Sequence, residues 1–378
     1  MAPLLSDISI SQFFGKGVGD NTLFLSKGVP LWSNLQKKII TAAVGFVIMA
    51  LLPLLGLGEG NAENMAEEIV SAVQSMSDSQ EKSLVKPEDS EEEPQGDAAA
   101  NGTDSFVILD TGSGNVVTID DRSFCVGALA YEMLPSCDEE ALKAQCIACY
   151  THFCRLRDSQ REKPDDELKG AYLKADLTNG KVYLSDEILK EKWGEQYEKY
   201  KSKLSGAVDA VFGKKLTDGN GELIDACYFA LSSGMTENAE DIFGFESPYL
   251  KAVPSPWDKQ APGWCSEKTV SRKEFYRLLS SGSNEFSEEK GIGEIKRTPG
   301  GSIISAEIGG VQFTGMKLRE IFGLRSANIE ITPKGDNIVF TVKGYGHGVG
   351  MSQYGADAMA KQGADYREIL LHYYGVTI

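Results

Sequence analysis

The sequence has little positive charge for its length. Its 378 residues include 38 lysines and arginines against 55 aspartates and glutamates, a net charge of −17. Residues 105–378 alone carry a net charge of −8. Because binding to a phosphate backbone needs clustered basic side chains, this balance argues against a nucleic-acid partner. It is compatible with a neutral or zwitterionic glycan.

The sequence also lacks internal repeats and a regular alternation of strand and helix patterns. Hydrophobic patterns and turn residues predict hairpins at 106–119 and 215–231, and short strands between turns over 292–343. They predict helices at 121–133, 138–155, 185–200, 271–279, 317–322 and 352–362. This mixture predicts an α+β fold of helices and short antiparallel strands, in one domain over residues 104–378.

Residues 59–103 contain no phenylalanine, tyrosine or tryptophan, and residues 59–104 hold 13 acidic and 2 basic residues. Such a segment cannot bury enough apolar surface to fold. It is predicted to be an acidic disordered linker that holds the following domain away from the membrane. A tail that binds a specific partner is the alternative.

Residues 39–58 lack charge altogether. About 20 apolar residues are enough to cross the hydrocarbon core as one helix, so this segment predicts an N-terminal transmembrane helix. Lys37 and Lys38 precede it and acidic residues follow, which places residues 1–38 in the cytoplasm and the rest outside, as in a single-pass membrane protein. A cleaved signal peptide is the alternative, but the 38-residue leader is long and no clean cleavage site follows.

A second Asp-Thr-Gly or Asp-Ser-Gly motif is absent. The motif at Asp110-Thr-Gly-Ser113 follows a strand pattern, as in aspartic proteases, but those enzymes need two aspartates that share a proton. A single motif would require a dimer. We therefore expect Asp110 to form a hairpin turn.

The run from Gly344 to Gln353 places four glycines at alternate positions around His347 and leads into an alanine-rich helix. Glycines in a strand cost stability, so this pattern is typical of backbone that approaches a ligand or takes positive φ. We expect His347, Ser352 and Gln353 to lie near a cleft. A tight turn after a strand is the alternative.

Two further motifs accompany this run: Phe124–Pro135 with Glu140–Gln145, and Gly234–Asp241 with Tyr249–Asp258. With the ending Ile369–Gly375, they resemble the stage II sporulation protein D family, whose members are membrane-anchored peptidoglycan lytic transglycosylases. The resemblance covers about residues 104–378 and implies that substrate strands are first stripped of stem peptides by a partner amidase. It also implies a bridging membrane protein and a role in septal peptidoglycan remodelling during engulfment. Some relatives are non-catalytic amidase activators, which gives an alternative function.

Glu132 is the candidate catalytic acid. It ends an apolar helix, and both its apolar neighbours and the negative helix end should raise its pKa. From the residues alone, a glutamate that points to water remains the alternative. The resemblance implies that Glu132 protonates the glycosidic oxygen between N-acetylmuramic acid and N-acetylglucosamine. It then takes the proton of the C6 hydroxyl, which closes a 1,6-anhydro ring without water or a cofactor.

The helix at 138–155 carries two stripes of residues. The better core stripe is Leu142, Cys146, Cys149 and Phe153, which leaves Lys143 and Tyr150 on the other face. The resemblance implies that Lys143 binds substrate; a solvated lysine is the alternative. Tyr150 stands where relatives carry an arginine, so we expect it to stack on a sugar or to lower activity.

The segment from Thr236 to Asp241 concentrates carboxylates and an amide. Thr236 is expected to cap a short helix. The resemblance favours a role for Thr236, Glu237, Asn238 and Asp241 in binding sugar hydroxyls; capping of helices is the alternative.

The seven cysteines are an odd number, which suits a reducing or anaerobic setting better than a set of disulfides. Some relatives bind zinc, and Cys137, Cys146, Cys149, His152 and Cys154 lie close in sequence. Ligands on different faces of one helix do not converge on a tetrahedral ion. We therefore expect buried thiols and no metal site.

Overall fold

The computed structural model describes residues 104–281 and 285–378. The first half contains β1 (Ser105–Asp110), β2 (Val116–Asp120), α4 (Asp121–Glu132), α5 (Glu139–Glu162), η3 (Asp166–Leu168), β3 (Leu173–Ala175), α6 (Asp186–Trp193), η4 (Gly194–Gln196), α7 (Tyr197–Val211), β4 (Tyr228–Phe229), α8 (Ala239–Phe243) and η5 (Pro256–Gln260). The second half contains β5 (Cys265–Ser271), α9 (Arg272–Ser280), η6 (Glu288–Lys290), β6 (Ile292–Arg297), β7 (Ile303–Ile308), β8 (Val311–Phe313), α10 (Gly315–Phe322), β9 (Ile329–Lys334), β10 (Asn337–Lys343), β11 (Met351–Ser352), α11 (Gln353–Lys361) and α12 (Tyr366–Tyr374).

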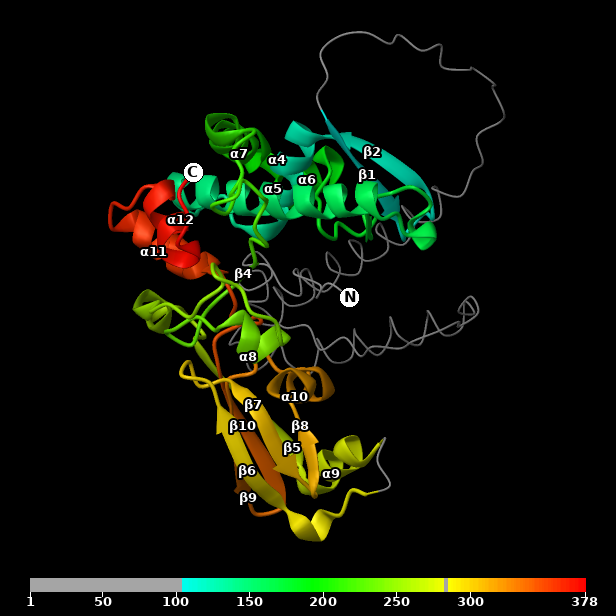
Figure 1. Ribbon diagram of the computed structural model, residues 1–378, viewed down its shortest axis with the longest axis vertical. Coiled ribbons are helices and arrows are strands. Elements are labelled where there is room, and N and C mark those ends of the chain that lie inside the picture. Colours follow the sequence, from blue (N-terminus) through cyan, green and yellow to red (C-terminus); the bar gives the residue numbers. More distant parts are fainter. Residues whose placement is uncertain (1–103, 282–284) are drawn as a thin grey trace, which may run out of the picture. The chain divides into compact units, whose positions relative to one another are not determined.

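A first hydrophobic core gathers around α5. Residues of β1, α4 and α7 pack there together with residues of the C-terminal helices α11 and α12, which lie beside α5 in Figure 1. Both stripes of α5 are buried, because Ile147, Tyr150 and Cys154 are covered as fully as Leu142 and Cys149. The helix therefore has no broad solvent face in its middle, unlike an amphipathic surface helix.

A second hydrophobic core lies between residues 270 and 342. It joins α9 and α10 with two three-stranded sheets, in the orders β5-β10-β9 and β6-β7-β8. Phe275, Phe322 and Phe340 form its aromatic centre. The predicted α+β class is confirmed, and the described residues form two large hydrophobic cores, with two smaller clusters around Leu109 and Leu231.

Most strand pairs among the described residues are antiparallel, as predicted, but two of them are parallel. β1 pairs with β3, and β11 pairs with β4 over Met351↔Tyr228 and Ser352↔Phe229. The second pair brings the end of the glycine-rich run beside Tyr228, more than a hundred residues earlier in the chain. Long-range pairs of two residues leave no periodic signal in the sequence, which explains why they were not predicted.

The hairpin at 106–119 is confirmed, and Asp110 closes its turn. The Asp110 carboxylate accepts hydrogen bonds from Gly112 N, Ser113 N and Oγ, Leu177 N and Thr178 Oγ1. Five donors use the acceptor capacity of the carboxylate, and they hold its pKa well below its usual range. A proton-sharing protease aspartate is incompatible with this arrangement.

The hairpin predicted at 215–231 is confirmed only at its tip, where a turn around Asp218 is closed by one antiparallel bridge, Thr217↔Leu223. The segment then runs on to β4. Ser185 and Ser271, which begin the helices predicted at 185–200 and 271–279, are N-cap residues, since each side chain accepts a backbone N–H of the following helix.

The predicted transmembrane helix at 39–58, the cytoplasmic segment at 1–38 and the linker at 59–103 lie outside the described residues. Among the residues that the structure does describe, none belongs to a helix with the length and apolar character needed to span a membrane.

Candidate active site

Glu132 ends α4 inside the first core. Glu132 is 3% exposed, and its Oε2 accepts a hydrogen bond from Gln353 Nε2 at 3.2 Å. Tyr228 also hydrogen-bonds to this carboxyl group. The helix end therefore meets β4 and the start of α11, which the β4–β11 pair holds together. The prediction of poorly hydrated surroundings for Glu132 is confirmed.

Burial raises the pKa of Glu132 to about 8, although the bonds from Gln353 and Tyr228 act in the opposite direction. At neutral pH the group therefore holds its proton, as a general acid must. No positive charge is needed to keep it in the core, because a protonated carboxyl group is neutral.

The buried proton of Glu132 predicts a pH-dependent stability difference between the wild type and Glu132→Gln. Between the unfolded pKa of about 4.5 and the folded pKa of about 8, the unfolded chain releases a proton that the native chain keeps. The unfolding free energy of the wild type should thus fall by up to about 1.4 kcal/mol per pH unit in this window, a loss that Glu132→Gln does not share. Urea melts of both proteins from pH 5 to 9 measure the difference, and parallel pH curves would contradict the buried proton.

The glycine-rich run passes from β10 to β11 with four positive φ angles: 79° at Gly344, 111° at Gly346, 87° at Gly348 and 81° at Gly350. These values confirm the backbone conformation that the sequence predicted. Gly350 leaves no room for a side chain, because an added Cβ would lie 2.0 Å from the carbonyl oxygen of Cys227. The close approach allows Met351 N to donate to that same carbonyl.

Gly350→Ala should destabilise the protein far more than Gly363→Ala. Gly363 also has positive φ, 101°, but an added Cβ there meets no atom within 4 Å. The control variant Gly363→Ala should lose about 1 kcal/mol of unfolding free energy, from conformational strain alone. Gly350→Ala should lose about 1–3 kcal/mol more, because its Cβ also clashes with backbone. Equilibrium urea unfolding measures both values. Equal losses would show that the contact with Cys227 relaxes without cost.

Asp258 anchors the far side of the site, and the sequence analysis did not single it out. It is fully buried; its Oδ1 accepts from Ser352 Oγ at 2.9 Å, and its Oδ2 accepts from Ser232 N at 3.2 Å and from Ser232 Oγ. Ser352 also caps α11 by accepting from Gly355 N. Burial raises the pKa of Asp258 to about 6, against the hydrogen bonds from these serines. Asp258 thus fixes the residue that precedes Gln353.

Glu237 and His347 line one small cavity. Glu237 N donates to Gly348 O at 2.8 Å, and the Glu237 side chain is enclosed by Gly348 on one side and Gly300 on the other. Burial raises the pKa of Glu237, opposed by hydrogen bonds with Ser302 and Thr298. His347 Nδ1 accepts from Val349 N, and its ring lies against Phe229 and Phe243. Ser233, Ser302 and Asn328 add further polar side chains to the lining of this cavity.

The other residues of the 236–241 segment hold backbone. Thr236 does not cap a helix as predicted: it is fully buried, and its Oγ1 accepts from Val253 N. Asn238 is the N-cap residue of α8; its side chain accepts from Ala252 N and donates to Asp241. Thr236 and Asn238 therefore hold loop backbone, and neither side chain caps a helix; a role of Thr236, Asn238 and Asp241 in binding sugar hydroxyls stays a prediction.

Lys143 is already paired. Its Nζ lies 2.8 Å from carboxylate oxygens of both Glu139 and Glu140, and its side chain is 14% exposed. Glu140 in turn accepts from Tyr366 N of α12. A role of Lys143 in substrate binding stays a prediction, and it would require a substrate group to compete with two carboxylates.

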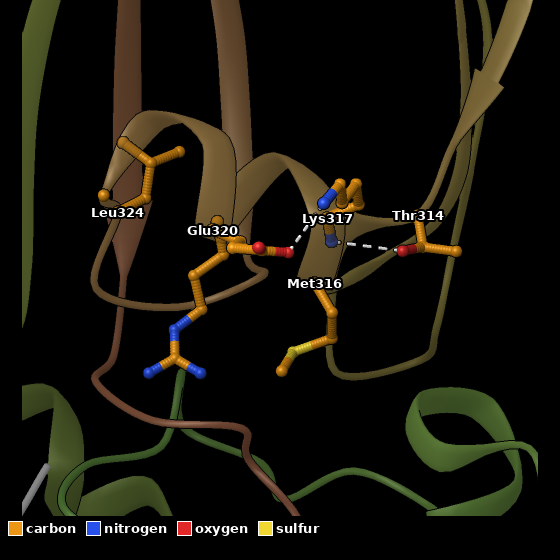
Figure 2. A pocket seen from close by; sticks show the side chains of 7 residues that line it. Thr314, Met316, Lys317, Glu320 and Leu324 are labelled. Carbon is orange, nitrogen blue, oxygen red and sulfur yellow. Dashed lines mark hydrogen bonds and ion pairs between the residues drawn. The ribbon is translucent and has the colours of Figure 1, made fainter. Parts of the chain in front are cut away.

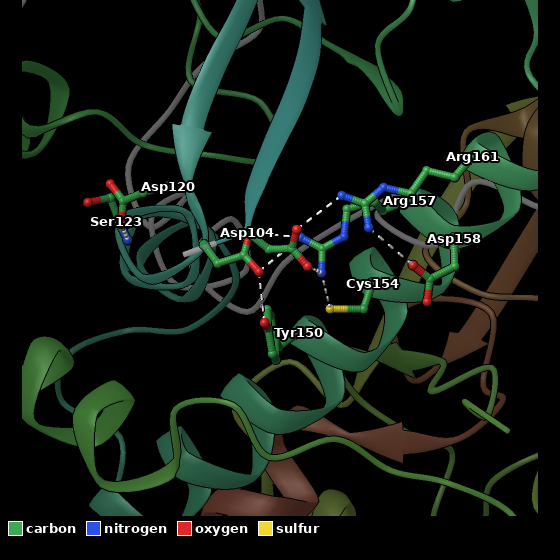
Figure 3. A network of polar contacts seen from close by, with 9 residues as sticks. Asp104, Asp120, Ser123, Tyr150, Cys154, Arg157, Asp158 and Arg161 are labelled. Atoms are coloured by element: carbon green, nitrogen blue, oxygen red, sulfur yellow. Dashed lines mark hydrogen bonds and ion pairs between the residues drawn. The ribbon is translucent and has the colours of Figure 1, made fainter. Parts of the chain in front are cut away.

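Tyr150 corrects the expectation of a sugar-stacking ring. Figure 3 shows its hydroxyl directed to a carboxylate; it donates to Asp121 at 2.7 Å, and Asp121 also accepts from Arg157 at 2.9 Å. The ring is 8% exposed and packs against Phe106 and Phe212. The second stripe of α5 faces the core, so Tyr150 belongs to a buried ion-pair network and not to the site.

The cysteines are free thiols, six of them buried and Cys265 exposed. Burial raises the pKa of Cys137 and Cys149, which keeps these thiols protonated. Within residues 104–281 and 285–378, no group of three or more histidine, cysteine or acidic side chains is placed to hold a metal ion.

A cavity of about 580 Å³ lies beside α10. Figure 2 shows its lining, in which Lys317 Nζ pairs with Glu320 at 2.9 Å and Lys317 N donates to Thr314 Oγ1. All of its lining residues fall between Thr314 and Leu324, on this one helix and its ends. It shares no residue with the cavity of Glu237 and His347, so we do not include it in the site.

The comparisons with known proteins identify the family of this chain. Residues 110–217 match a family model described as stage II sporulation protein. The stage II sporulation protein D of Bacillus amyloliquefaciens is 40% identical over 277 residues, which cover 72% of this chain and 78% of that protein. The chain belongs to the stage II sporulation protein D family. The Bacillus subtilis member is 39% identical over 276 residues, 72% of this chain and 78% of that protein.

A more distant relative carries a different function in its name. The amidase enhancer of Bacillus subtilis is 27% identical over 309 residues, which cover 67% of this chain and 40% of that protein. The chain is thus similar both to stage II sporulation proteins and to a protein named amidase enhancer, and this similarity does not by itself choose between two activities.

Proposed function

We propose that this protein is a membrane-anchored lytic transglycosylase that cleaves linkages between N-acetylmuramic acid and N-acetylglucosamine in peptide-stripped glycan. It acts on septal peptidoglycan during sporulation and engulfment, with a cell-wall amidase and a bridging membrane protein as partners. The observation that carries the proposal is the neutral, buried carboxyl group of Glu132 at the junction of α4, β4 and α11.

In this proposal Glu132 acts twice. It donates its proton to the glycosidic oxygen as the bond to C1 breaks, and the resulting carboxylate accepts the proton of the C6 hydroxyl. That hydroxyl closes the 1,6-anhydro ring, so protons balance with one titratable group. Gln353 Nε2 and Tyr228 stabilise the carboxylate between the two transfers.

Substrate access requires movement near Glu132. The residue is 3% exposed, so a sugar reaches the carboxyl group only when Gln353 leaves its hydrogen bond. The preceding glycine-rich run supplies backbone that tolerates such a shift, and the N-terminus of α11 follows it directly. Closure around the sugar afterwards would exclude water, which favours ring closure over hydrolysis.

Product analysis tests this function. Peptide-stripped glycan incubated with the full chain should release fragments that end in 1,6-anhydro-muramic acid, identified by mass spectrometry. Fragments that end in reducing sugars would mean hydrolysis and would contradict the proposal.

Activation of an amidase is the second candidate. It is favoured by the similarity to a protein named amidase enhancer and by the enclosure of Glu132. A purified cell-wall amidase assayed with and without the full chain separates the two, because an activator stimulates the amidase even when Glu132 is replaced by glutamine.

A further inference from the structure

A groove with surplus positive charge lies next to the cavity of Glu237 and His347. We call it the cationic groove, after Lys259, Arg297 and Lys343, which line it together with Trp264. Its volume is about 280 Å³, close to the lower end of the range for small-molecule sites. One carboxylate, that of Glu330, also lines it, so the lining has a net charge of about +2.

Two lysines of the groove are not neutralised by a carboxylate of the described residues. Neither Lys259 nor Lys343 forms an ion pair with any residue that the structure describes, whereas Lys143, Lys201 and Lys361 each do. Residues 105–378 carry a net charge of −8, so acidic partners are abundant elsewhere on the chain. Unpaired cations gathered in a concave site of an acidic protein favour an anionic ligand.

The groove is held in place by its neighbours. Arg297 donates to Gly301 O at 2.9 Å and to Ile329 O at 2.7 Å, which leaves other guanidinium N–H groups for a ligand. The stem of Lys259 lies over Gly234, where an added Cβ would be 2.2 Å from its Cε. The side chains of Arg297 and Lys259 are therefore already restrained, so that binding a ligand costs them little conformational entropy.

Trp264 supplies an aromatic surface. Its Nε1 donates to Ser232 O at 3.2 Å, and Lys343 Nζ lies 5.9 Å from its ring centroid. The ring is half-buried, so one part of it remains available to a ligand. A fixed indole beside ammonium groups suits a ligand that combines an apolar sugar face with an acid.

The groove is continuous with the cavity of Glu237 and His347. Ser233, Asn328 and Lys343 line both the groove and the cavity of Glu237 and His347. Ser233 Oγ and Asn328 Nδ2 each donate to Gly300 O at 2.8 Å, which fixes the wall between them. A strand that passes the glycine-rich run would therefore place a neighbouring sugar at the groove.

We infer that the cationic groove binds the lactyl carboxylate of a muramic acid residue and so selects glycan strands whose stem peptides have been removed. This inference rests on the proposed function and names what its site recognises. In a strand that still carries peptides, the lactyl carboxyl group is part of a neutral amide. Hydrolysis of that amide leaves a carboxylate on the sugar, and only then can Lys259, Arg297 and Lys343 form charge-assisted hydrogen bonds.

Binding without turnover tests the groove. The full chain with Glu132→Gln is titrated with peptide-stripped strands, and with the same strands after their lactyl carboxylates are converted to methylamides. The methylamide strands should bind about tenfold more weakly, which corresponds to about 1.4 kcal/mol. Added salt should reduce this preference for strands with free carboxylates. Lys259→Gln with Lys343→Gln should remove the preference, while Lys296→Gln, the adjacent cation of β6, should keep it.

Two results would overturn the inference: equal binding of both strands by the parent protein, or an unchanged preference in the double variant. Free stem peptide that binds with the same affinity and the same dependence on Lys259 and Lys343 would assign the groove to peptide carboxylates instead. These outcomes are separate from the proposed function. Absence of anhydro products from the wild type would end the transglycosylase proposal, whatever the binding preference is.

Discussion

Glu132→Gln is expected to lower the release of anhydro-muramyl fragments by about 10²–10⁴-fold, the contribution of a positioned general acid. Glutamine has nearly the size of a protonated glutamic acid and keeps a partner for Gln353 Nε2, which lies 3.2 Å from the carboxyl oxygen. It cannot donate an acidic proton to a leaving oxygen or accept one back. Initial rates on peptide-stripped glycan, quantified by mass spectrometry, measure the loss.

The control for this variant is Glu139→Gln. Glu139 lies in the first turn of α5, is exposed and pairs only at the surface with Lys143. Glu139→Gln makes the same side-chain substitution at an exposed carboxylate and should leave the rate within about twofold, since surface pairs contribute little. Full activity of Glu132→Gln, with its fold intact by urea unfolding, would remove Glu132 as the acid and favour the amidase activator.

The sequence predicted the apolar surroundings of Glu132 because part of its environment is local. The apolar residues of α4 and the end of the helix are contiguous with it, and both the burial and the raised pKa are found. The glycine-rich run was predicted for the same reason: alternating glycines are a property of a single segment, and each has positive φ.

Asp258 was missed because its environment is not local. Its partners Ser232 and Ser352 lie 26 and 94 residues away, so no spacing in the sequence connects them. A signal was nevertheless present, since Asp258 ends the Tyr249–Asp258 motif beside Trp257. Tyr228 was missed similarly, since its contact with Glu132 depends on the parallel β4–β11 pair.

The error at Tyr150 has a different cause. Periodicity identified the stronger apolar stripe of α5 correctly, and the weaker stripe was then assigned to solvent. In the structure β1 and α7 also pack in the core around α5, which covers that weaker stripe. A tyrosine, a cysteine and an arginine on that stripe are polar enough to mislead a hydrophobicity pattern, because their polar atoms are paired with Asp121 and one another.

Asp121→Asn is expected to destabilise the protein by about 3 kcal/mol without changing the chemistry at Glu132. Asp121 and Arg157 are both buried, with side chains 2% and 3% exposed, and loss of the carboxylate leaves the guanidinium charge without its main partner. Asp104 Oδ2, 3.3 Å from Arg157 Nη2, is half exposed and offsets only part of the loss. Equilibrium unfolding in urea measures the effect.

Tyr150→Phe completes this test, because it removes one hydrogen bond and leaves the ion pair intact. It should cost about 1.5 kcal/mol, less than Asp121→Asn, and the turnover of peptide-stripped glycan should stay within about twofold of the wild type. In this family member the tyrosine at position 150 would then serve the stability of α4 and α5, and its difference from the arginine of relatives would carry no catalytic cost. A large loss of turnover in a stably folded Tyr150→Phe would instead return Tyr150 to the site.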